Sequence, residues 1–183
     1  MQKITVSANE AGQRLDKLLG KYLSNAPMSF VYKMLRKKNI KLNGKKAQGN
    51  EKLTKGDQVE VFLSDAPGAE KQLPADLARA IESSIRLSVI YEDPDILILN
   101  KPSGMLSQKA APSDLSLNEY MIAYLLKKGD LKLAELATFR PSVCNRLDRN
   151  TSGLVTAGKS LAGLQQLSEI LRDRTVKKYY LTI

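Results

Sequence analysis

A short segment of small residues and turn formers, residues 64–70 (S-D-A-P-G-A-E), divides the sequence into two parts. Residues 1–65 contain 13 Lys and Arg against 6 Asp and Glu, whereas residues 66–183 contain 16 against 13. The whole chain has 183 residues, 43% of them hydrophobic, which suits one medium or two small domains with buried cores. We predict two domains, residues 1–63 and 86–183, joined by a linker over residues 64–85.

The composition restricts the chemistry that the chain can perform. The formal charge of +10 favours a polyanionic partner such as nucleic acid. The sequence has no histidine, which excludes imidazole bases, Ser-His and Cys-His nucleophile pairs, and histidine metal sites. Its single cysteine, Cys144, forms neither an internal disulfide nor a metal-binding cluster. No run reaches the roughly 18 apolar residues that span a bilayer. We therefore expect a cytoplasmic protein with no metal and no membrane partner.

The first part has the pattern of two helices on a small sheet. Strands are expected at residues 2–6 and 58–62, and a first helix at residues 14–22. A second helix over residues 29–38 carries Lys33, Arg36 and Lys37 on one face, at helical spacing. Between that helix and the last strand, Lys41 lies in a short strand that ends at Asn43-Gly44, a strong hairpin signal, and Lys45 follows the turn. Positive charge is therefore expected to gather on one side of this domain.

The second part mixes helices and strands without a strict βαβ order. A helix-compatible stretch covers residues 74–83, and a hairpin is expected over residues 87–91 and 96–99. Ser116 and Glu119 have capping-box spacing ahead of a helix that Gly129 would end. The remaining elements are a buried strand at 153–157, a helix at 161–171 and a β-prone stretch at 176–183. The fold class is α+β, with a mixed and mainly antiparallel sheet in this domain.

The densest polar cluster is N-R-L-D-R-N-T-S-G over residues 145–153, where Asp148 lies between Arg146 and Arg149. One interpretation makes Asp148 a turn residue whose oxygens accept nearby backbone N–H groups. The other makes it a nucleophile or base, because a carboxyl with a reference pKa of about 3.9 is ionised at neutral pH. The arginines would then hold a phosphate or keep the carboxylate charged. Chemistry alone leaves both interpretations open.

This cluster resembles the catalytic loop of the RluA-type pseudouridine synthases, whose usual pattern is H-R-L-D-x-x-T-S-G. Residues 100–104, N-K-P-S-G, resemble the N-K-P-x-G segment of that family, and residues 178–180 resemble its later K-x-Y motif. Residues 1–63 are similar to the small RNA-binding domain first seen in ribosomal protein S-four, through R-L-D at 14–16, L-N-G-K at 42–45 and K-G-D at 55–57. Asn145 departs from the family pattern, which commonly has histidine there.

The resemblance implies a role for several residues. Asp148 would be the catalytic aspartate, Tyr180 would pack against the target uracil, and Arg146 would fill the place of a flipped uridine. The remaining residues would bind RNA: Arg14, Lys33, Arg36, Lys37, Lys41, Lys45, Lys101, Arg149 and Lys178.

The resemblance also implies the partner and the reaction. The expected activity is isomerisation of uridine to pseudouridine in structured RNA, with large-subunit ribosomal RNA as first choice and transfer RNA as second. No organic cofactor is expected, because isomerisation involves no net redox change, and we expect a monomer. Synthase domains of this type continue well past the K-x-Y strand, so the catalytic domain is expected to be incomplete here. The alternative is a non-catalytic RNA-binding protein that acts through its N-terminal domain.

Overall fold

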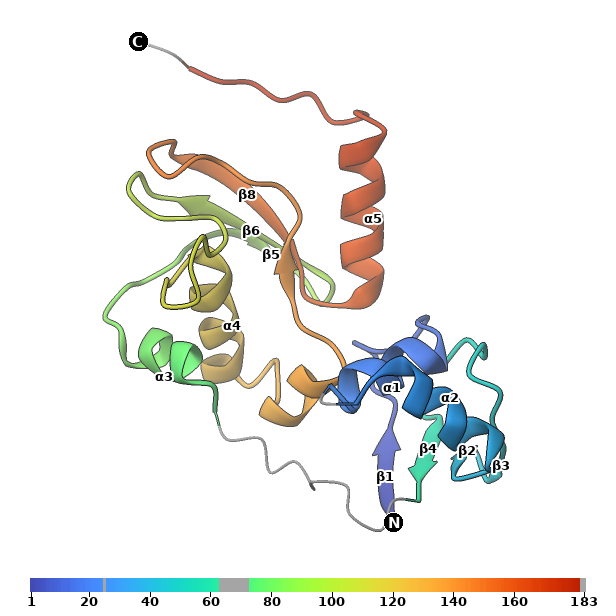
Figure 1. Cartoon of the computed structure of the whole chain (residues 1–183). Helices are drawn as coiled ribbons and strands as arrows, with labels where there is room; N and C mark the ends of the chain where they lie inside the picture. The colour runs from blue at the N-terminus through green and yellow to red at the C-terminus, as the bar shows by residue number, and fades with distance from the viewer. Residues whose placement is uncertain (25, 63–72, 182–183) are drawn as a thin grey trace.

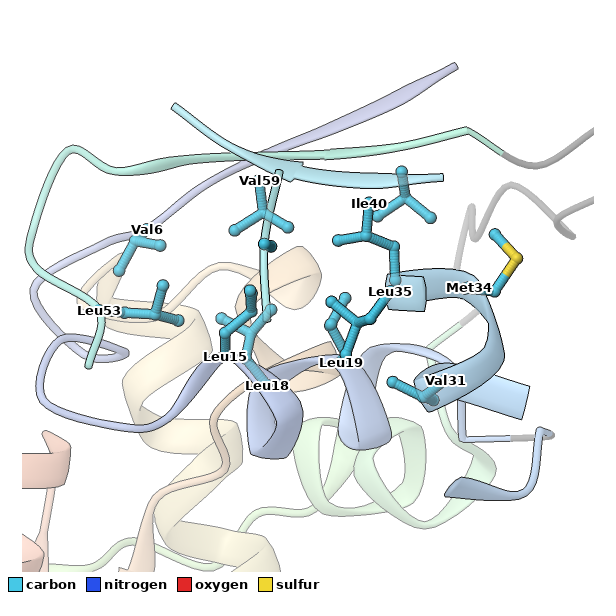
Figure 2. Packing of buried hydrophobic residues seen from close by; sticks show 12 residues of the cluster. Val6, Leu15, Leu18, Leu19, Val31, Met34, Leu35, Ile40, Leu53 and Val59 are labelled. Atoms are coloured by element: carbon cyan, nitrogen blue, oxygen red, sulfur yellow. The ribbon is translucent and has the colours of Figure 1, made fainter. Parts of the chain in front are cut away.

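The computed structural model describes residues 1–24, 26–62 and 73–181. Its first sheet has the strand order β1-β4-β2-β3 and is antiparallel throughout. The strands are β1 (Gln2–Thr5), β2 (Ile40–Leu42), β3 (Lys45–Lys46) and β4 (Gln58–Val61). The helices α1 (Leu15–Tyr22) and α2 (Met28–Arg36) pack on this sheet, as Figure 2 shows from close by. The prediction of two helices on a small sheet is therefore confirmed.

The core of this part comes from the apolar stripes of α1 and α2 and the inward side chains of the strands. Its buried members are Val6, Leu15, Leu18, Leu19, Val31, Met34, Leu35, Ile40, Ala47, Leu53, Val59 and Val61. The turn between β2 and β3 has positive φ at both Asn43 (51°) and Gly44 (75°), as a two-residue hairpin of this kind requires. The hairpin expected at Asn43-Gly44 is therefore present, and it places Lys45 beside the end of β2.

The second sheet, in the order β5-β6-β8-β7, is also antiparallel. Its strands are β5 (Ser88–Glu92), β6 (Ile96–Lys101), β7 (Ser142–Val143) and β8 (Gly153–Gly158). The other elements are the helices α3 (Ala75–Glu82), α4 (Leu117–Lys128) and α5 (Leu161–Arg172) and the 3-10 helix η1 (Leu133–Ala137). Figure 1 shows α4 and α5 on opposite sides of this sheet, with α3 beside α4. The α+β fold class, with mainly antiparallel pairing, is confirmed.

The ends of α4 follow the sequence signals closely. Ser116 is the N-cap, and Glu119 accepts hydrogen bonds from its backbone N–H (3.2 Å) and its hydroxyl (2.6 Å). Gly129 ends the helix in the left-handed conformation, with φ of 84°. The fixed helix places its apolar side chains against the sheet residues Leu97 and Leu99 in a second core.

The expected linker, residues 64–85, contains an ordered element. Its first part lies outside the described residues, but α3 packs against α4, and Leu77 is buried in the second core. Residues 75–82 therefore belong structurally to the second core and do not form an open connector. The domain limits 1–63 and 86–183 stay a prediction.

The β-prone stretch over residues 176–183 is not a strand in residues 176–181, and residues 182 and 183 lie outside the described part. Residues 176–181 are exposed after the end of α5, so no neighbouring strand supplies backbone partners there. The prediction of a strand is therefore wrong for these six residues.

Candidate active site and nucleic-acid interface

Asp148 lies in the loop between β7 and β8, and its side chain is exposed. Within the described part of the chain the carboxylate accepts no hydrogen bond and forms no ion pair, not even with Arg146 or Arg149 on either side of it. The carboxylate is therefore not the satisfied turn residue of the first interpretation, in which its oxygens accept backbone N–H groups. It is an accessible anion that can meet a ligand.

The backbone on the N-terminal side of Asp148 is attached to β8. The Asn145 side-chain oxygen accepts the backbone N–H of Thr156 at 2.7 Å and its hydroxyl at 2.9 Å, while Asn145 Nδ2 donates to the carbonyl of Leu154 at 3.2 Å. The position where the resembling family commonly has histidine is thus used here to fix the loop to the strand. On the other side of the loop, Gly153 has φ of 138°, a conformation that glycine adopts without the strain a side chain would cause.

The loop is also attached to residues 103–107, which follow β6. The Ser107 hydroxyl accepts the Leu147 N–H at 3.0 Å and donates to the Leu147 carbonyl at 2.7 Å. The Ser103 hydroxyl donates to the Asn150 carbonyl at 2.9 Å. Asp148 is therefore held between hydroxyl contacts at Leu147 and Asn150, while its own side chain makes none with the described residues.

Lys101 connects the Asp148 loop with the segment that follows β6. It is fully buried, and its Nζ donates to the carbonyls of Pro102 (3.0 Å), Met105 (2.7 Å) and Arg149 (3.1 Å). Burial lowers the pKa of the ammonium, and the negative charge of Asp148 opposes that shift. Because Lys101 has no exposed surface and all three of its N–H groups have partners, it cannot contact an RNA phosphate directly. The predicted RNA-binding role of Lys101 is corrected to a structural one, holding the Asp148 loop.

The two arginines beside Asp148 differ in their contacts. Arg146 is exposed and makes no hydrogen bond or ion pair with the described residues. Arg149 is also exposed, but its Nε donates to the Gly104 carbonyl at 3.1 Å, and the Gly104 N–H donates back to the Arg149 carbonyl at 2.8 Å. Arg149 lines a cavity of about 440 Å³ next to the loop, whereas Asp148 is not among its lining residues. Of the exposed side chains of Asp148 and Arg149, only that of Arg149 lines this cavity.

Lys178 and Tyr180 lie in the segment after α5 and are exposed, Tyr180 at 63%. Neither makes a hydrogen bond or ion pair with the residues that the structure describes. The structure thus brings Lys101, Arg146, Asp148 and Arg149 together, but it does not bring Tyr180 and Lys178 to this group through any such contact. Their roles stay predictions.

Exposed basic side chains gather on the N-terminal part, as predicted from their spacing. Lys33, Arg36 and Lys37 are exposed on or directly after α2, and Lys45 is exposed on β3. Arg36 also lines a groove of about 260 Å³ that continues along Tyr32 and Lys46. This surface can hold a phosphate backbone, because the side chains offer several N–H donors without competing carboxylates in the groove lining.

Two other predicted RNA-binding residues are partly engaged inside the protein. Lys41 is half-buried and its Nζ lies 5.2 Å from the centre of the Phe62 ring. Arg14 donates to both oxygens of Asp16, at 3.2 and 2.8 Å, and Tyr32 also donates to Asp16 at 3.0 Å. Burial raises the pKa of Asp16, but these hydrogen bonds and the charge of Arg14 outweigh it, so that the pKa is lowered. Arg14 therefore stabilises a buried carboxylate in addition to any contact with RNA.

The described residues contain neither a metal-binding cluster nor a membrane-spanning helix. Within residues 1–24, 26–62 and 73–181, no group of three or more acidic or cysteine side chains is arranged to hold a metal ion. In the same ranges, no helix has both the length and the apolar character needed to cross a bilayer.

Comparison with known families agrees with the two-part architecture. Residues 95–183 match the family described as RNA pseudouridylate synthase, and residues 13–59 match the S4 domain. The first match includes the whole Asp148 loop, and the second includes α1, α2 and the β2–β3 hairpin. Residues 95–183 are thus similar to the RNA pseudouridylate synthase family and residues 13–59 to the S4 domain, in agreement with the resemblance that the sequence motifs indicated.

Curated relatives carry the same name in several bacteria. The chain is similar to "Ribosomal large subunit pseudouridine synthase C" of Vibrio cholerae, at 32% identity over 98% of this chain and 54% of the relative. It is 30% identical to the protein of that name from Escherichia coli K12, over 98% of this chain and 53% of the relative. The chain therefore spans about half the length of the curated relatives it matches. A human structure, "RNA Pseudouridylate Synthase Domain Containing 4", is 18% identical with a TM-score of 0.41, covering 55% of this chain and 34% of that one.

The residues that fix the loop were not recognised from the sequence. Ser107 lies 40 positions before Leu147, and Ser103 lies 47 positions before Asn150. The N-K-P-S-G motif could indicate that this region matters, but a single sequence has no signal for which serine contacts which carbonyl.

Proposed function

We propose that the chain isomerises uridine to pseudouridine in structured RNA, with Asp148 as the catalytic group. Ribosomal RNA of the large subunit is the first substrate class and transfer RNA the second. The observation that carries the proposal is the exposed, unpaired carboxylate of Asp148 on a loop whose backbone is fixed at Leu147, Arg149 and Asn150. The match of residues 95–183 to the synthase family and the names of the similar proteins support it.

The reaction breaks the bond between ribose C1′ and uracil N1 and forms a bond between C1′ and C5. The C5 hydrogen leaves as a proton and N1 gains one, so that atoms and electrons balance without a redox partner. Asp148 acts in one of two ways: its carboxylate attacks C1′, or it removes a proton from the sugar. Both routes need an ionised carboxylate that the ribose can reach, which an exposed and preorganised side chain provides.

The remaining roles follow the charge distribution. Lys33, Arg36, Lys37 and Lys45 bind phosphates of a structured RNA and position it, without reading its sequence. Arg146, exposed beside Asp148, occupies the stack when the target uridine is flipped out. Tyr180 and Lys178 are proposed to approach the uracil from the segment after α5 once RNA is bound, with Tyr180 supplying a stacking surface.

The test compares the wild-type chain with Asp148→Asn on a large-subunit ribosomal RNA transcript labelled with tritium at uridine C5. Isomerisation releases that tritium into water, and the variant should lose about a hundredfold or more of the rate while filter binding to the same RNA stays nearly unchanged. Asp173→Asn, which changes an exposed aspartate after α5, is the matched control and should release tritium at the wild-type rate. Full activity in Asp148→Asn contradicts the proposal. Tight RNA binding without tritium release by the wild-type chain would instead identify a non-catalytic RNA-binding protein.

A further inference from the structure

The cavity beside the Asp148 loop has the size and lining of a ligand site. Its volume of about 440 Å³ falls in the range of pockets that bind small organic groups. Its apolar lining is formed by half-buried side chains from the segment after β6, the loop before α4 and α4 itself, which are Met105, Leu106, Leu115 and Tyr120. Tyr120 is thus a half-buried aromatic residue of the cavity lining, which also contains the exposed residues Ser103 and Arg149.

Two charged side chains face the same cavity with unused hydrogen-bonding capacity. Arg149 uses Nε for the Gly104 carbonyl, and its terminal nitrogens make no hydrogen bond with the described residues. Asp114 uses Oδ2 to accept the N–H groups of Ala110 (3.1 Å) and Ala111 (2.7 Å), which fixes the carboxylate, while Oδ1 takes no hydrogen bond from the part of the chain described. The cavity thus combines an aromatic wall, a cation and an oriented acceptor.

We infer that this cavity binds the nucleotide next to the target uridine, with its base against Tyr120 and its phosphate on Arg149. An aromatic face beside an arginine is the arrangement that proteins use for single-stranded RNA, where unstacked bases are held by stacking and by contacts to their edges. Because Asp148 is exposed and its neighbour Arg149 lines the cavity, a chain of nucleotides can present one sugar to Asp148 and the adjoining base to the cavity. This inference rests on the proposed function for the identity of the neighbouring nucleotide.

The free oxygen of Asp114 gives the cavity a base preference. A carboxylate oxygen only accepts hydrogen bonds, so it favours the exocyclic amino group of adenine, cytosine or guanine over uracil, whose only ring donor, N3–H, lies between two keto oxygens that repel the carboxylate. Asp114→Asn keeps an oxygen for the Ala110 and Ala111 N–H groups and places amide donors where Oδ1 was. The preference should then move towards uracil.

The experiment is a titration of the full chain, followed by amide NMR shifts, with AMP, CMP, GMP, UMP and ribose 5-phosphate. The amides of Gly104, Leu106 and Arg149 should shift with the nucleotides, and the three amino-bearing bases should bind about fivefold or more tightly than UMP. Tyr120→Leu should weaken nucleotide binding by about fivefold or more through the loss of stacking. Tyr91→Leu, which changes an exposed tyrosine on β5 outside the cavity lining, is the control and should leave binding unchanged.

The outcomes separate this inference from the proposed function. Tritium release by the wild-type chain, without nucleotide shifts at the cavity, overturns the inference alone. Equal shifts with ribose 5-phosphate and with the nucleotides also overturn it, because only a phosphate site would then exist. Nucleotide binding at the cavity that is weakened in Tyr120→Leu and unchanged in Asp148→Asn supports it, even if no RNA is isomerised and the proposed function fails.

Discussion

Replacing Lys101 with methionine tests whether a buried cation holds the Asp148 loop. The substitution keeps an unbranched side chain of similar length but removes the ammonium that joins Pro102, Met105 and Arg149. The contacts of Ser107 with Leu147 stay chemically intact. Any loosening of the loop can therefore be assigned to the lost ammonium.

The expected cost follows from the three carbonyls. A buried polar group left without a partner costs about 1–3 kcal/mol. The Arg149 carbonyl keeps the Gly104 N–H at 2.8 Å, and Pro102 is exposed and can turn to water, so that the Met105 carbonyl bears most of the loss. Methionine also removes the cost of burying a charge, which offsets part of the effect. We expect a decrease of about 1–3 kcal/mol in the free energy of unfolding.

The assay combines urea unfolding with amide hydrogen exchange. In Lys101→Met, the Gly104 and Leu147 amides, which are bonded to Arg149 and Ser107, should exchange faster than in the wild type. Lys127→Met is the matched control, because Lys127 is exposed near the end of α4, and it should change neither measurement. If Lys101→Met fails to fold, Lys101→Arg keeps the charge while its guanidinium misfits the three carbonyls, and exchange is measured on that variant. Unchanged stability together with unchanged exchange of both amides would refute the reasoning.

Three further predictions concern other parts of the chain. A methyl group added by Gly163→Ala would overlap the Asp95 carbonyl, so thermal melts should show a loss of about 1–3 kcal/mol, and an unchanged melting temperature would contradict the packing of α5. The pKa of Asp16 is lower in the folded chain than in the unfolded chain. The ionised carboxylate therefore stabilises the fold fully at pH values above its unfolded-state pKa, and this stabilisation is lost as the pH falls through its folded-state pKa. In urea unfolding, Arg14→Gln should therefore lower the free energy of unfolding by up to about 1 kcal/mol at pH 7, because Arg14 is exposed, and by much less at pH 2. An equal loss at both pH values would argue against the Arg14–Asp16 ion pair. Arg36→Gln should reduce the log–log salt slope of RNA binding by about 0.7–0.9, and an unchanged slope removes Arg36 from the interface.

The sequence predicted features whose cause is local. The Ser116 and Glu119 capping box, the Gly129 helix end and the Asn43-Gly44 hairpin each depend on residues within a few positions, and each is present. The strand expected over residues 176–183 failed in its described part because strand propensity acts only when a partner strand supplies hydrogen bonds. The 3-10 helix η1 and the two-residue strand β7 were not predicted, since both are too short for a periodic signal.

The sequence motifs located the candidate site but gave the wrong environment for Lys101. A lysine in a basic chain is most simply interpreted as a solvated phosphate contact, and its burial depends on Arg149, 48 positions away. Position 145 was noted only as a departure from the family pattern, yet Asn145 holds the loop to Thr156 through two hydrogen bonds. Contacts between residues so far apart in the sequence form only in the folded sheet, in which β6 and β8 lie side by side.

The residues that fix the Asp148 loop do not include the Asp148 carboxylate itself. The contacts that hold the loop use backbone groups or the side chains of Lys101, Ser103, Ser107, Asn145 and Arg149, and among the described residues none uses the Asp148 carboxylate. Because the Asp148 carboxylate makes no contact with the described residues, it does not stabilise the folded loop. Asp148 thus has no structural role through its carboxylate among the described residues, in agreement with the proposed catalytic role, whereas a structural aspartate such as Asp16 shows its role through the hydrogen bonds it accepts.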